Sequence, residues 1–229
     1  MASVTEIVLL PIKPDTAAAV IDTNMQTLLS QPGCLRVRQS RVHEDPAKLR
    51  LFADWESLEQ HQAFVQNAAV YGPFRASMAS IVDAAAGPRK PPYHAQFAPF
   101  PPAVLDNLKP GARSKVTELL LAYFPAEYGE AQRETARQTT LRFTEELKKT
   151  ADAMSGEVAL GWSVENDVDF KGEPCRVLVT AIGWDSIEQH VKARETEGFA
   201  KAIPMLRNLE GLKGMEMCHL INTTTERGN

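Results

Sequence analysis

The sequence has few cysteines, no pattern typical of a targeting segment in its first residues and little excess charge of either sign. Cys34, Cys175 and Cys218 are far apart, and no CxxC pair indicates a zinc or redox site, so we expect buried, reduced thiols. The first apolar run ends at Pro11 and follows no basic segment, which argues against a signal peptide or a membrane anchor. The expected location is therefore the cytoplasm, with no membrane partner.

A nucleic-acid partner is also not expected. The net charge is −4, and the basic residues are mixed with acidic ones along the chain. No basic stripe of the kind that follows a phosphate backbone is visible.

Motifs for cofactors are absent as well. No GxGxxG follows a predicted strand, and the chain contains no GxxxxGKS/T loop, no HExxH and no GxSxG. We therefore predict neither an organic cofactor nor a metal ion.

What the sequence does contain is an internal duplication. With 44% hydrophobic and 24% charged residues the composition is that of a folded, soluble protein. Two motifs recur in the same order. The first is Val4-Thr5-Glu6-Ile7-Val8-Leu9-Leu10, which recurs as Val116-Thr117-Glu118-Leu119-Leu120-Leu121-Ala122. The second is Trp55-Glu56-Ser57-Leu58-Glu59-Gln60-His61, which recurs as Trp184-Asp185-Ser186-Ile187-Glu188-Gln189-His190. Such self-similarity indicates two copies of one structural unit.

Each copy is predicted to be a βαββαβ unit. In the first, we expect strands at 4–10, 34–43 and 49–55 and a last strand around His94. The first helix is capped by Asp15, and the second begins at Ser57 and is broken near 71–73. In the second, strands at 116–124, 157–165, 175–183 and 214–222 alternate with a helix over 126–153 and one from Ser186. A proline-rich stretch separates the copies, so we place the first unit at 1–101, a linker at 102–114 and the second unit at 115–229.

The predicted fold class is α+β, with two ferredoxin-like units. A sheet with both helices on one face still has an apolar face to cover. We expect the second copy to cover it, so that the two sheets pack against each other as a barrel formed within one chain.

The duplicated Trp-x-Ser-x-Glu-x-His element, followed by an aromatic residue at Tyr71 and at Phe199, resembles the dimeric α/β-barrel superfamily and, more narrowly, the antibiotic biosynthesis monooxygenase domain. The resemblance covers 4–98 and 116–222. It implies a ligand cavity between sheet and helices in each unit, used in relatives for cofactor-free oxygenation of phenolic or quinol-like compounds, for cyclisation or for haem degradation. Neither first strand contains the Asn that haem-degrading relatives carry there, which disfavours that branch.

Histidines are the candidate bases for such chemistry. His61 and His190 lie at matching positions of the second helices, and His94 and His219 lie on the last strands. Each has a structural alternative, as a core residue that is hydrogen-bonded locally. Tyr71 is a candidate proton donor or a filler of the helix break. The candidate catalytic residues are His61, Tyr71, His94 and His190.

Candidate substrate-binding residues are Trp55, Trp184, Arg38 and His219. Both tryptophans close a third strand and either anchor the core or stack on a planar ligand. Arg38, with Arg36 on the same strand face, either holds an anionic or phenolic oxygen or forms an ion pair.

Three functions remain open on the sequence. The first is a cofactor-independent monooxygenase for an aromatic, polyketide-like small molecule, the second a cyclase or isomerase in the same cavity, and the third a ligand-binding or stress-associated protein without turnover. The first half combines His61, Tyr71 and His94 and is the expected active half. A homodimer of fused chains is a further possibility.

Overall fold

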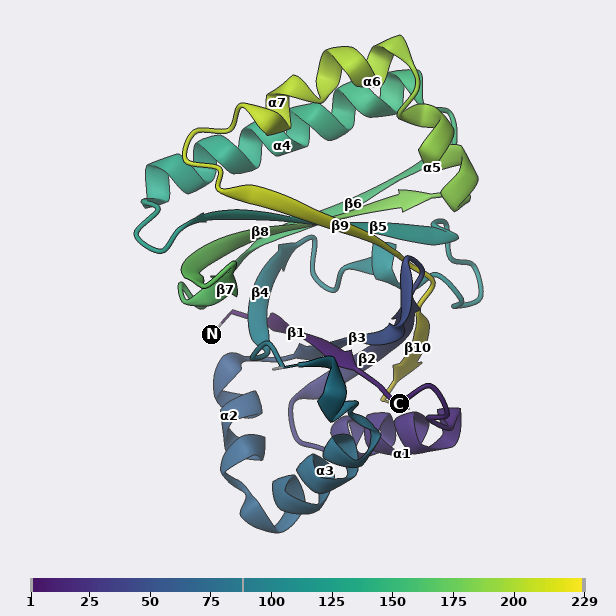
Figure 1. Ribbon diagram of the computed structural model, residues 1–229, viewed down its shortest axis with the longest axis vertical. Helices are drawn as coiled ribbons and strands as arrows, with labels where there is room; N and C mark the ends of the chain where they lie inside the picture. Colours follow the sequence, from purple (N-terminus) through teal and green to yellow (C-terminus); the bar gives the residue numbers. More distant parts are fainter. Residues whose placement is uncertain (1, 88, 228–229) are drawn as a thin grey trace. The chain divides into compact units, whose positions relative to one another are not determined.

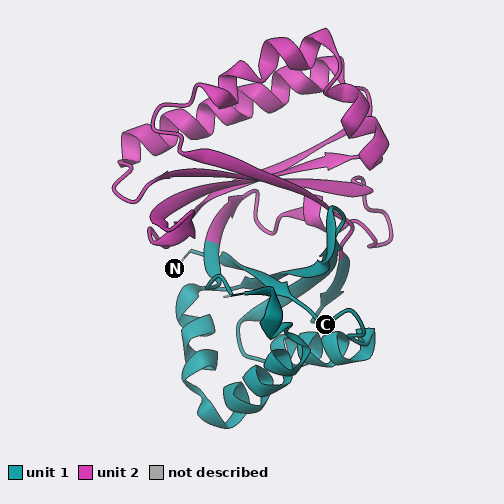
Figure 2. Cartoon of the chain, in the orientation of Figure 1, with its two compact units in different colours: residues 1–94, 223–229 teal, residues 95–222 magenta. Residues whose placement is uncertain are grey.

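The structure is a computed structural model that describes residues 2–87 and 89–227 (Figure 1). The chain divides into two compact units (Figure 2). The first runs to His94 and also includes the terminal segment from Thr223, and the second comprises Ala95–Asn222.

The first unit places its helices on one face of an antiparallel sheet (Figure 1). Strand alternation sends every second side chain of a strand toward these helices. The elements in chain order are β1 (Val4–Pro11), α1 (Ala18–Leu29), β2 (Cys34–Val42), β3 (Asp45–Trp55), α2 (Leu58–Gln66), α3 (Ala68–Ile81), η1 (Ala84–Ala86) and the start of β4 (Tyr93–Ala98), with β10 (Thr223–Glu226) added from the end of the chain.

The second unit repeats this plan with a longer first helix. Helix α4 lies along one face of the sheet together with α6 and α7 (Figure 1). The elements are η2 (Ala103–Leu105), β5 (Val116–Pro125), α4 (Glu130–Thr150), β6 (Met154–Ser163), β7 (Val168–Phe170), β8 (Glu173–Trp184), α5 (Ile187–Ala193), α6 (Glu197–Ala202), α7 (Pro204–Arg207) and β9 (Gly214–Leu220).

The strand order confirms the ferredoxin-like prediction for both units. In the first unit the order is β2-β3-β1-β4, and in the second it is β6-β8-β5-β9. In each case the first and third strands of the βαββαβ unit are central neighbours, as this arrangement requires.

The two units are divided at His94 and at Asn222, and not at the expected linker 102–114, because residues on either side of that linker pair with strands of the other half of the chain. Ala95–Ala98, the second part of β4, pairs with β6 from Ala95↔Ser163 to Ala98↔Leu160, so these residues belong with the second unit. At the other end β10 pairs with β2, from Thr223↔Gln39 to Glu226↔Arg36, and so joins the first unit.

The caps of the two duplicated helices are confirmed. Ser57 accepts a hydrogen bond from the backbone N–H of Gln60, and Ser186 accepts one from that of Gln189. The expected cap at Asp15 is wrong: α1 starts at Ala18 with Ala17 at its N-cap, two residues later than expected, and both the backbone N–H and the hydroxyl of Thr16 donate to the carbonyl of Lys13.

The helix break in the first unit lies at Asn67 and not near Pro73. Pro73 is inside α3, where it removes the hydrogen bond that the carbonyl of Ala69 would accept. Ala69 is exposed, so water can replace that bond. In the second unit the expected single helix from Ser186 is three short ones, because Thr196 caps α6 and Pro204 begins α7.

All three cysteines are buried, as expected, and among the described residues they form no disulfide.

Candidate functional site

The first unit contains a cavity of about 510 Å³ between its sheet and its helices. This volume is within the range of small-molecule sites, about 300–1,000 Å³. Its walls are mainly apolar, and they include Met25, Leu28, Leu51, Phe64 and Met78. The cavity therefore offers mainly hydrocarbon and aromatic surface to a ligand.

Three buried polar residues meet at this cavity and contact one another in a row. Nδ1 of His61 lies 2.7 Å from Nε2 of His94, and Nε2 of His61 lies 3.5 Å from Oε2 of Glu6. All three side chains line the cavity. With the Glu6 carboxylate at one end, this row can take up a proton at an imidazole and stabilise the resulting positive charge.

Local sequence places each member of the row. Alternation along β1 sends Glu6, Val8 and Leu10 to the helix side of the sheet, where they line the cavity. The Ser57 cap fixes the start of α2, which puts His61 one turn further on. Trp55 is fully buried at the end of β3 and packs on His61 with ring centroids 4.9 Å apart.

The second unit holds the same row of residues. Nδ1 of His190 lies 2.6 Å from Nε2 of His219, and Nε2 of His190 lies 3.3 Å from Oε2 of Glu118. Here Nε1 of Trp184 also donates a hydrogen bond of 3.0 Å to Oε2 of Glu118. The duplicated motifs therefore encode a duplicated contact network, and not only a duplicated fold.

The surroundings of the two rows differ. His190 and His219 are 2% and 3% exposed, against 9% and 7% for His61 and His94. The space between α4 and its sheet is filled by a hydrophobic core cluster, with Phe199 and Met217 packed against it. Large members of this cluster are Leu120, Phe124, Phe143, Leu147, Leu178 and Leu206. A smaller pocket of about 160 Å³ lies elsewhere in this unit, and none of the three row residues lines it.

Burial of Glu118 has a measurable consequence. Burial raises the pKa of its carboxyl from 4.5 to about 7, against the opposing effects of the Trp184 hydrogen bond and the charge of Arg194. Between pH 4.5 and about pH 7, Glu118 loses its proton in the unfolded chain and keeps it in the folded chain. The contribution of Glu118 to the free energy of unfolding is therefore largest below pH 4.5 and falls by about 3 kcal/mol as the pH rises to about 7.

We expect Glu118→Gln to remove this loss. The amide oxygen can still accept the hydrogen bond from Trp184. Relative to the wild type, the variant should gain about 3 kcal/mol in the free energy of unfolding between about pH 4 and about pH 8, measured by urea unfolding. Glu145→Gln on the exposed face of α4 is the control. An equal difference between Glu118→Gln and wild type at both pH values would contradict the prediction.

Of the other predicted site residues, Tyr71 lines the cavity and Arg38 does not. Tyr71 contacts Phe64 edge-on, with ring centroids 5.3 Å apart. Arg38 is fully buried and pairs with Asp54 at 2.9 Å, and Asp54 also accepts a hydrogen bond of 2.7 Å from Thr5. Thr5 is adjacent to Glu6 on β1, so this ion pair lies on the opposite sheet face from the cavity.

Trp55, a candidate for either core packing or substrate binding, packs behind His61 and does not line the cavity. Trp184 holds the same place behind His190, with ring centroids 4.6 Å apart. His190 and His219 contact each other in the second unit and do not reach the cavity of the first. The structure thus gathers His61, His94 and Tyr71 at one cavity.

The sequence interpretation missed Glu6 and Glu118. The signal was present, because each Glu stands in the duplicated Val-Thr-Glu motif, flanked by apolar residues on a predicted strand. A charged residue at an inward strand position requires a partner, and the histidines provide it. It also missed three cations that line the cavity, Arg75, Arg89 and Lys90. Among the described residues, no three His, Cys, Asp or Glu side chains form a group suited to a metal ion.

Comparison with known families agrees with this geometry. The family model described as antibiotic biosynthesis monooxygenase matches residues 3–71, a range that contains Glu6, His61 and Tyr71. Over this range the first unit is similar to the antibiotic biosynthesis monooxygenase family. This domain match supports a monooxygenase. The search of curated proteins found no match.

Solved structures similar to the chain share its two-unit fold. An anthrone oxidase-like protein has a TM-score of 0.65 at 13% identity, over 100% of this chain and 95% of that one. A candidate monooxygenase from Lactobacillus acidophilus has a TM-score of 0.57 at 11% identity, over 100% and 98%. One from Fusobacterium nucleatum has a TM-score of 0.57 at 9% identity, over 100% and 96%. At these identities the likeness concerns the fold.

Within the described part of the chain, none of the helices has the length and apolar character needed to cross a membrane.

Proposed function

We propose that this protein is a cofactor-independent monooxygenase that oxidises an electron-rich aromatic or phenolic small molecule in the cavity of the first unit. The observation that carries the proposal is the Glu6–His61–His94 row at an apolar cavity of about 510 Å³. Anthrones and hydroquinones of polyketide type, products of secondary metabolism, have the required chemistry.

The reaction begins with removal of a proton. For an anthrone, the histidine pair takes a proton from the methylene carbon, and the carbanion gives one electron to dioxygen. The substrate radical and superoxide combine into a peroxide, which takes up a proton. Loss of the second methylene proton then breaks the O–O bond. One oxygen atom stays as the new carbonyl, the other leaves as water, and the four electrons that dioxygen accepts all come from the substrate.

Each part of the cavity has a role in this scheme. The histidine pair is the base, and Glu6 stabilises the imidazolium that forms. Tyr71 can donate its phenolic hydrogen to the substrate oxygen on which negative charge develops. The apolar walls exclude water, so that the carbanion meets dioxygen before it is reprotonated.

Isotopically labelled dioxygen tests the reaction directly. We expect purified protein, treated with a chelator and free of flavin absorbance, to convert anthrone to anthraquinone with one labelled oxygen atom per product molecule. Mass spectrometry of the product and an oxygen electrode provide the measurements. Label found only in water, or oxygen uptake no faster than with heat-denatured protein, would refute the proposal.

A cyclase or isomerase is the second candidate, because the histidine pair and Tyr71 line one cavity and can act as base and acid without oxygen. Product formation from an open-chain polyketone under strict anaerobiosis would favour it over the monooxygenase. A binding protein without turnover is less well supported, since the cavity contains two hydrogen-bonded histidines that simple ligand retention does not require.

A further inference from the structure

We propose that Arg75 and Arg89 select substrates that carry an anionic oxygen group, such as a carboxylate, and hold that group at the mouth of the first-unit cavity. This inference rests on the proposed function and names its substrate class. Both residues line the cavity, and both are exposed at its edge.

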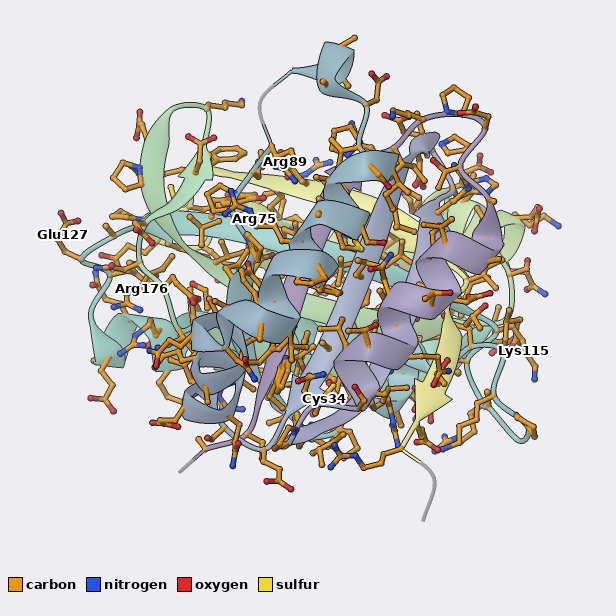
Figure 3. All side chains as sticks on the ribbon, turned by 90° about the horizontal axis from the view of Figure 1, so that it is seen from below. Cys34, Arg75, Arg89, Lys115, Glu127 and Arg176 are labelled. Atoms are coloured by element: carbon orange, nitrogen blue, oxygen red, sulfur yellow. The ribbon has the colours of Figure 1, made fainter. Side chains whose placement is uncertain are left out.

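The two arginines reach the cavity from different elements. Arg75 is on α3, one turn after Tyr71, and Phe74 and Met78 share its side of the helix at helical spacing. Arg89 is on the segment between η1 and β4. Figure 3 shows the two labelled side chains near each other beside α3. Lys90 lines the same cavity.

The described residues that line the cavity include no exposed carboxylate that would offset the charges of Arg75 and Arg89. Glu6 is the single acidic residue among those that line the cavity, and it is buried and directed at His61. Within residues 2–87 and 89–227, neither Arg75 nor Arg89 has an ion pair or a hydrogen bond from its guanidinium group. Arg137 on α4, by contrast, pairs with Glu134 at 2.8 Å.

Charge and shape together indicate how such a substrate lies. A guanidinium group binds a carboxylate through two parallel hydrogen bonds, and two of them at one opening attract an anion from solution. The apolar walls accommodate the ring system, and the buried histidines face its reacting carbon. The cavity is therefore basic at its mouth, apolar in the middle and proton-accepting at its inner end.

A matched pair of ligands tests the inference. An anthrone that bears one carboxylate and the methyl ester of the same compound share the ring system and differ in the charge of the group at the predicted contact and by one methyl group. Titration calorimetry under anaerobic conditions measures binding without turnover. We expect the wild type to bind the acid about a hundredfold more tightly than the ester, and this preference to weaken as salt is added.

The variants Arg75→Gln and Arg89→Gln should each weaken binding of the acid about tenfold and leave the ester unchanged. Arg142→Gln on α4, an exposed helical arginine away from the cavity, is the control and should change neither. Equal binding of acid and ester by the wild type, no binding of either, or equal losses for both ligands in the variants would overturn the inference.

Oxygen uptake measured in parallel separates this inference from the proposed function. Arginine-dependent binding of the acid without oxygen uptake supports the anion site and refutes the monooxygenase. Equal oxidation of acid and ester, unaffected by the two substitutions, refutes the anion site and supports the monooxygenase.

Discussion

Replacing His61 by alanine is expected to lower oxygen uptake with anthrone about a thousandfold, the usual contribution of a general base. The substitution removes the central member of the row, so the proton taken from the substrate no longer reaches a ring that Glu6 can stabilise. Initial rates at an oxygen electrode, with substrate well above KM, provide the measurement.

The duplication supplies an internal control for this variant. His190→Ala removes an imidazole with the same neighbours, a histidine at 2.6 Å, a glutamate at 3.3 Å and a tryptophan face. Its cost in stability should be similar, and its effect on activity should be less than about twofold once the folded fraction is matched. A loss of activity in His190→Ala with activity retained in His61→Ala would place the active site in the second unit.

Replacing Arg38 by methionine is expected to destabilise the protein by about 3–5 kcal/mol without changing activity in the folded fraction. The substitution leaves Asp54 without its ion-pair partner in a fully buried site, where one hydrogen bond from Thr5 remains. Urea unfolding measures the loss, and oxygen uptake per folded molecule tests the substrate-binding role that the sequence left open for Arg38.

Arg36 is the matched control, two residues earlier on β2. It pairs with Glu226, but both side chains are partly exposed, at 16% and 35%. Arg36→Met should therefore cost no more than about 1 kcal/mol. A raised KM in Arg38→Met, with unfolding like that of the wild type, would show that Arg38 binds substrate and has no structural role.

The two copies of the network lie in different surroundings. In the first unit the row of residues opens on a cavity bounded by a short α1 and the broken pair α2 and α3. In the second unit the longer α4 brings Phe143 and Leu147 over the sheet, and the corresponding row is enclosed by packed side chains. We infer that the first unit performs the chemistry and that the second has kept the network as part of its core.

Local patterns were sufficient to predict much of the fold. Strand alternation, the Ser57 and Ser186 caps and the two repeated motifs identified the strands, the duplicated helix starts and the βαββαβ order, because each depends on neighbours in the sequence. The helix break was misplaced because Pro73 is tolerated where the carbonyl it leaves unpaired faces solvent, and exposure is a property of the packed chain.

The sequence by itself determined that the chain is a duplication, that each half carries a histidine on its second helix and on its last strand, and that no known cofactor motif is present. Only the tertiary structure decided that the histidines pair with each other and with Glu6 or Glu118, that the row of the first unit meets a cavity, and that Arg38 forms a buried ion pair with Asp54. The reason is physical: a hydrogen bond between residues far apart in the chain, and the volume left between a helix and a sheet, depend on how side chains pack in three dimensions, which sequence spacing does not specify.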